Sequence, residues 1–158
     1  MSNTSRVSSA PPMGWVLVAN AARARSFVRD AENNAMRELC SFVHPESRLK
    51  GEALGTDRGG KVHKGVASTQ FQPHTDLHDK EHAEFARELA HYLEGAALAH
   101  AYTDLAIIAG KAFLGDLRAQ LGAATRQLLR TSVPLDLSSF EGAELEHRVA
   151  KALADATA

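Results

Sequence analysis

The first third of the chain contains three short apolar segments separated by residues that favour turns. Residues 14–20 (GWVLVAN), 25–28 (RSFV) and 36–43 (MRELCSFV) each have the length and apolar content of a strand. Only four residues, 21–24, join the first two segments, and the connection at 31–34 contains two asparagines, which tolerate positive φ. Connections this short join antiparallel neighbours, so the pattern predicts a three-stranded meander.

The apolar spacing becomes helical after residue 75. Intervals of three and four place the apolar residues on one face of an amphipathic helix over 76–97. Thr75 or Asp76 is the expected N-cap, because a side-chain oxygen at that position accepts from the free backbone amides of the first turn. The residues on the apolar face are Leu77, Phe85, Leu89, Tyr92, Leu93 and Ala96.

The last third of the chain alternates strand and helix patterns. Residues 104–109 (DLAIIA) form the clearest buried strand, and its helical neighbours favour parallel pairing within the sheet. Gly110 follows, then a short helix marked by apolar positions from 113 to 121 and a strand near 127–133. The segment 138–141 (SSFE) has the form of a capping box and is expected to start a final helix.

The order of elements is therefore βββαβαβα. It predicts one α/β domain over residues 13–154, built on a mixed five-stranded sheet with helices on its faces. Ribonuclease-H-like folds share this order.

Length and composition agree with a single globular domain. The chain has 158 residues, of which 44% are hydrophobic and 23% charged, and its formal net charge of −1 excludes a strongly basic nucleic-acid coat protein. Cys40 is the one cysteine in the sequence and so forms no intrachain disulfide. Residues 1–12 are expected to be a disordered tail without signal-peptide character. No apolar run approaches the length of a membrane span. These features predict a cytoplasmic protein without a membrane span. The spacing of apolar residues does not distinguish a helix face in the core from one in an interface, so the sequence is compatible with a homo-oligomer.

The long segment 44–75 is expected to be a Gly-rich loop. Loops of about 30 residues inside a compact domain are usually functional or disordered. Backbone amides between glycines can approach a phosphate, and basic side chains add charge. The segment carries more basic than acidic residues, and its candidate RNA- or ligand-binding residues are Arg48, Arg58, Gly59, Gly60, Lys61 and Lys64.

Two histidines have the spacing of metal ligands. His78 and His82 lie four residues apart on one helical face, and such a pair binds a transition metal when a third ligand, here His74 or Glu81, converges on it. Alternatively the pair packs at the edge of the apolar stripe. A ribonuclease-H-type metal site needs several carboxylates, beginning on the first strand. That strand ends at Asn20 and carries no acid, and no other motif requires a cofactor.

Five segments in order resemble the bacterial host attachment protein family. They are the strand and Ala-Arg-Ala-Arg turn at 15–25, the exit from the third strand at 42–49, the loop at 57–62, the helix entry at 75–90, and FLGDLR at 113–118. The resemblance covers about residues 13–150, and the family's name implies a role in attachment to host cells.

That family is related in turn to the middle domain of archaeo-eukaryotic peptide chain release factors. The relationship implies the same element order and a Gly-Gly-Gln loop that reaches the peptidyl-transferase centre of the ribosome. Gly59 and Gly60 match the two glycines, whereas Lys61 replaces the glutamine. A ribosome or tRNA is the implied partner, without the hydrolytic chemistry of that glutamine.

The sequence thus favours a non-enzymatic protein that contacts RNA or the ribosome through the basic Gly-Gly loop. One alternative is an adhesion factor at the cell surface. A second is a hydrolase, either release-factor-like or dependent on a metal at His78 and His82.

Overall fold

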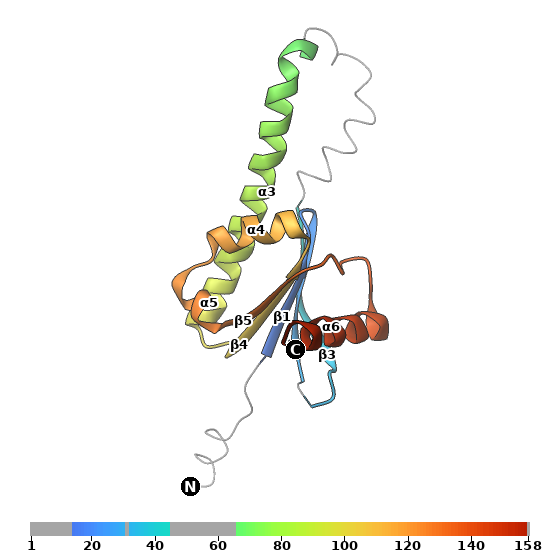
Figure 1. Ribbon diagram of the computed structural model, residues 1–158. Helices are drawn as coiled ribbons and strands as arrows, with labels where there is room; N and C mark the ends of the chain where they lie inside the picture. The colour runs from blue at the N-terminus through green and yellow to red at the C-terminus, as the bar shows by residue number, and fades with distance from the viewer. Residues whose placement is uncertain (1–13, 31, 45–65, 158) are drawn as a thin grey trace.

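A five-stranded mixed sheet lies at the centre of the molecule (Figure 1). The computed structural model describes residues 14–30, 32–44 and 66–157, with the side chains of 66–79 excepted. The strands are β1 (Gly14–Ala19), β2 (Arg23–Arg29), β3 (Met36–Val43), β4 (Asp104–Ala109) and β5 (Leu129–Pro134), and the sheet order is β3-β2-β1-β4-β5.

The pairing confirms the predicted α/β class and its mixed sheet. β1 pairs antiparallel with β2 and β2 antiparallel with β3, which is the expected meander. β4 pairs parallel with both β1 and β5. The tight turn before β3 contains Asn34 at φ 63, a conformation that asparagine tolerates.

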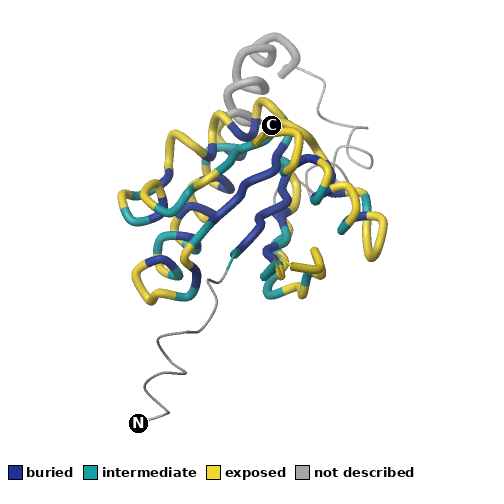
Figure 2. The backbone as a smooth tube through the Cα atoms, turned by 60° about the horizontal axis from the view of Figure 1, so that its bottom comes forward, coloured by how far each residue is buried: buried dark blue, intermediate teal, exposed yellow. Residues whose placement is uncertain are grey.

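Helices cover both faces of the sheet. They are α3 (Val66–Leu98), α4 (Lys111–Gln120), α5 (Ala123–Leu128) and α6 (Gly142–Thr157). The first three lie on one face, where Leu17, Leu89, Ile107 and Leu117 are fully buried. On the other face α6 is the one helix that the described ranges contain, and it packs through Leu145 and Val149 against alternate residues of the same strands. The central strands are therefore buried on both faces (Figure 2).

Three helix boundaries differ from those predicted. α3 begins at Val66, so Thr75 and Asp76 lie inside it and do not cap it, and the expected loop at 44–75 is helical from residue 66. The glycines of that segment end at Gly65 and none recurs before Gly95, so the residues between are compatible with a helix despite Pro73. The tail at 1–12 lies outside the described residues.

The other two differences lie near the C-terminus. α5 was not predicted, because its six residues are too few to show a period. The prediction of a capping box at 138–141 is wrong. The helix α6 begins at Gly142, and the Ser138 hydroxyl donates to Asp136 instead of capping that helix. Within the described part of the chain, no helix combines the length and apolar character that a bilayer crossing requires.

Glu94 of α3 caps α5, a different helix. Its Oε1 accepts from the Thr125 amide at 3.0 Å and the Thr125 hydroxyl at 2.8 Å, and its Oε2 accepts from the Ala124 amide at 3.2 Å. A side chain on Gly122 would place Cβ 2.5 Å from this carboxylate, so Glu94 would have to shift from its present position at the cap. The Thr125 amide and hydroxyl hold the pKa of Glu94 below its usual value of 4.5.

Removing this cap should destabilise the fold. We expect Glu94→Ala to lower the free energy of unfolding by about 1–2 kcal/mol at pH 7, measured by urea titration. Because the pKa of Glu94 is lowered in the folded state, the ionised carboxylate stabilises above pH 4.5, and its contribution is lost as the pH falls below that value. The difference from wild type should therefore shrink in acid. Glu88→Ala, at an exposed position of the same helix, is the matched control. A loss equal to that of the control at pH 7 would contradict the cap.

Candidate functional site at the carboxyl edge of the sheet

Four strands end at the same edge of the sheet. Because β1, β3, β4 and β5 run in one direction, their carboxyl ends lie together, and the chain leaves them at Asn20, His44, Gly110 and Leu135. Ligands of open α/β sheets bind outside the carboxyl ends of the strands. The same edge is where the segment 45–65 leaves the sheet, directly after His44.

The residues singled out in the sequence are only partly described. Arg48, Arg58, Gly59, Gly60, Lys61 and Lys64 lie outside the described residues. His78 belongs to α3, but its side chain is not described, and His82 is half-buried on the same helix. Within the described residues no three His, Cys, Asp or Glu side chains form a group able to hold a metal ion. The histidine pair stays a prediction.

A hydrogen-bonded network joins two loops at this edge. The Asn20 side-chain amide donates to Asp136 Oδ2 at 3.2 Å and to the Ser138 hydroxyl at 2.8 Å. The Ser138 hydroxyl in turn donates to Asp136 Oδ1 at 2.6 Å. The Asn20 Oδ1 accepts from the amides of Ala22 and Arg23, so one side chain holds both its own turn and the β5–α6 connection.

Asp136 is ionised in this network. Partial desolvation raises the pKa of its carboxyl, but the hydroxyl and amide of Ser138, the amide of Asn20 and the charge of Arg23 outweigh desolvation and hold the pKa below 3.8. Three hydrogen bonds occupy the carboxylate. With these hydrogen bonds the Asp136 carboxylate is suited to fixing the positions of the two loops.

Arg25 ties the same connection to β2. Its guanidinium donates to the carbonyl of Phe140 at 2.7 Å and to that of Ser138 at 3.3 Å. Arg23 and Lys111 are exposed near the ends of β1 and β4. The edge therefore presents basic side chains around one ionised carboxylate, which is suitable for contact with an anionic partner.

His44 fixes the point where the chain leaves β3. Its ring stacks on Phe85 of α3, with centroids 5.1 Å apart and planes 18° apart, and its amide donates to the Ala22 carbonyl at 2.9 Å. The histidine is 5% exposed, and its Nε2 has no hydrogen-bond partner among the described residues. Glu81, one helical turn before Phe85, is also buried. The residue that precedes the segment 45–65 is thus held by both the sheet and α3.

The sequence pattern singled out Asn20 but did not predict the other residues of this site, which are Arg25, His44, Asp136 and Ser138. The available signal was local: Asp136 and Ser138 are two residues apart, the spacing at which an aspartate accepts from a following amide. Their contact with Asn20 spans 116 to 118 residues and has no local signature.

Comparison with known proteins places this arrangement in a family. An uncharacterized protein of Rickettsia prowazekii (strain Madrid E) is 34% identical to this chain over 76 residues, which are 47% of this chain and 51% of that protein. The match thus spans about half the length of this curated relative. The sequence profile of the family described as proteins required for attachment to host cells matches residues 15–149. This match runs from β1 into α6 and includes every strand and the whole carboxyl edge, so the chain belongs to that family.

Proposed function

We propose that this protein is a non-enzymatic binding protein that contacts RNA, on the ribosome or as tRNA, through the basic segment between β3 and α3. The observation that carries the proposal is the place where this segment leaves the sheet. It follows the buried His44 on the carboxyl edge, where Arg23 pairs in register with Val43 and Lys111 is exposed after β4. Gly59, Gly60, Lys61 and Lys64 belong to this segment, and their chemistry suits a phosphate backbone.

Charge reversal within the segment should weaken binding to RNA. We expect the double variant Lys61→Glu, Lys64→Glu to bind purified bacterial ribosomes and bulk tRNA at least about tenfold more weakly at 0.1 M salt. The slope of log affinity against log salt concentration should fall by about 2, since each lysine that neutralises a phosphate releases about one counterion. Fluorescence anisotropy with labelled tRNA and cosedimentation with ribosomes measure the two affinities.

A control with the same change in charge tests whether the segment itself binds. Arg87→Glu with Arg118→Glu reverses two exposed charges on α3 and α4. This control is expected to keep most of the affinity. Equal weakening in both double variants would leave only net charge as the cause, and unchanged binding by the Lys61, Lys64 variant would exclude the segment.

The description of the family favours attachment to host cells as a second candidate function. The two candidates differ in location: an RNA-binding role places the protein in the cytoplasm, and a direct attachment role places it at the cell surface. Labelling intact cells with a membrane-impermeant biotin reagent separates them. Labelling of the protein before lysis would support attachment and contradict a purely cytoplasmic role.

A further inference from the structure

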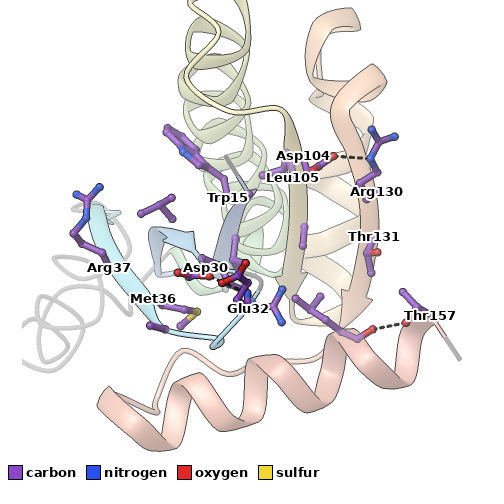
Figure 3. A pocket seen from close by; sticks show the side chains of 17 residues that line it. Trp15, Asp30, Glu32, Met36, Arg37, Asp104, Leu105, Arg130, Thr131 and Thr157 are labelled. Carbon is purple, nitrogen blue, oxygen red and sulfur yellow. Dashed lines mark hydrogen bonds and ion pairs between the residues drawn. The ribbon is translucent and has the colours of Figure 1, made fainter. Parts of the chain in front are cut away.

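A cavity of about 850 Å³ opens at the other edge of the sheet, where β1, β4 and β5 begin (Figure 3). Small residues are part of its lining: Gly14 has no side chain, and Ala106 on β4, which pairs with Val16, faces the α6 side. The last turns of α6, with Leu153 and Thr157, and the turn between β2 and β3 form its walls. Among the described residues α6 is the one helix packed on this face, and the part of the chain that the structure describes leaves the beginnings of the strands uncovered beyond its end.

Basic side chains extend the cavity on the α6 side. An adjoining depression of about 560 Å³ shares Arg29, Leu153 and Thr157 with the cavity and adds His147 and Lys151. Arg29 lies at the junction of the two. Its Nη2 donates to Asn34 Oδ1 at 2.5 Å, and its Nε is buried without a hydrogen-bond partner among the described residues. The guanidinium of Arg29 is a charged donor group that lines both hollows, and hydrogen bonds from a charged donor to an anion are the strong ones.

The cavity lining also contains three acidic residues, each with an interaction of its own or on the exposed turn. Asp104 pairs with Arg130 at 2.7 Å, as the dashed line in Figure 3 marks. Asp30 and Glu32 are exposed on the β2–β3 turn, where Asp30 Oδ1 accepts from the Glu32 amide. The residues that line the depression beside Arg29 include Lys151 and no acid, although Lys151 pairs with Asp155 at 3.4 Å on the same helix.

We propose that this cavity binds a small amphipathic organic anion. Its apolar body fills the space over Gly14, Val16 and Ala106, and its carboxylate, sulfonate or phosphate group contacts Arg29. Lys151, which also pairs with Asp155, is a second cationic side chain at the mouth. An apolar cavity with a few convergent polar groups is the usual form of a small-molecule site. The site lies at the edge of the sheet opposite the proposed RNA contact, so either can fail without the other.

The fluorescent probe 8-anilinonaphthalene-1-sulfonate has this chemistry, and N-phenyl-1-naphthylamine is its uncharged counterpart. We expect one sulfonate probe to bind per folded chain. Arg29→Met should raise its dissociation constant at least about tenfold, because a charge-assisted hydrogen bond is lost, and should leave binding of the uncharged probe unchanged. Arg118→Met, on the helical layer of the opposite face, is the matched control and should bind both probes as wild type does.

Filling the cavity should abolish binding of both probes. Thr131 lines the cavity and is half-buried, so Thr131→Phe directs a ring into it, and Ala106→Leu is a second variant should the first not fold, as judged by circular dichroism. Wild-type affinity for the sulfonate in Arg29→Met, or for both probes in a folded cavity-filling variant, would overturn the proposal. The Lys61, Lys64 double variant should bind the probes normally, which separates this site from RNA binding.

Discussion

Replacing Phe85 with alanine is expected to lower the free energy of unfolding by about 3–5 kcal/mol, the range found when a fully buried phenylalanine is truncated. The Phe85 side chain is 0% exposed. Its ring lies 5.7 Å from that of Phe113 on α4 and 5.1 Å from that of His44 at the end of β3. One side chain therefore connects α3, α4 and the strand exit at the carboxyl edge, and its loss leaves a cavity where the three meet.

Urea unfolding at pH 7 measures this loss. Phe85→Leu keeps most of the volume and should cost clearly less, because a smaller void remains. Leu98→Ala is the control for truncation on the same helix, since Leu98 is 65% exposed and should change stability by less than about 0.5 kcal/mol. A Phe85→Ala variant as stable as the Leu98→Ala variant would show that the ring does not hold these elements together.

Asn20→Asp is expected to destabilise the protein by about 2 kcal/mol at pH 7. The change keeps the oxygen that accepts from the amides of Ala22 and Arg23, but it replaces the donor to Asp136 with a second carboxylate. A hydrogen bond to a charged group, worth about 1.5–3 kcal/mol, becomes a repulsion between like charges. Because Asp136 is exposed, solvent screens part of this repulsion, and the loss stays below that of a buried pair.

The pH dependence distinguishes this cause from simple loss of a contact. Two facing carboxyls raise the pKa of one of them, so the destabilisation of the Asn20→Asp variant is largest above that raised pKa and decreases as the pH falls through it. A protonated carboxyl then donates where the amide did. Thermal unfolding at pH 7.5 and pH 5 measures the effect. Asn20→Ala lacks the second carboxyl, so its deficit should not decrease between these pH values. A deficit of Asn20→Asp that is equal at both would contradict the repulsion.

The elements whose own residues show a clear local pattern could be predicted from the sequence. β3 and β4 have the predicted bounds, because their apolar segments end at turn residues or at glycine. α4 lies where Phe113, Leu114 and Leu117 indicate it, and these three residues are buried. In each case the residues that decide the structure are close together in the chain.

Elements decided by distant contacts were not predictable. The local sequence at 138–141 satisfies the pattern of a capping box, yet Asn20, which is 118 residues away, holds Ser138 in a different role. α5 depends on Glu94 of α3 for its N-terminal cap, about 30 residues earlier in the chain. The cavity near Arg29 has no signature either, because it results from where α6 ends over the sheet. Local patterns therefore predicted the positions of most elements. The residues that make up the two sites could not be predicted, because only the folded chain brings them together.

The central position of β1 has a consequence for synthesis. Among the described strands β1 is made first, and its antiparallel partner β2 follows at once, but its other neighbour β4 pairs with it across about ninety residues of chain. Until that partner has left the ribosomal tunnel, one edge of an apolar strand stays open to pairing with other chains. Loop closure over this distance is also slow compared with formation of the meander. The nascent chain should therefore need chaperone protection until β4 is complete.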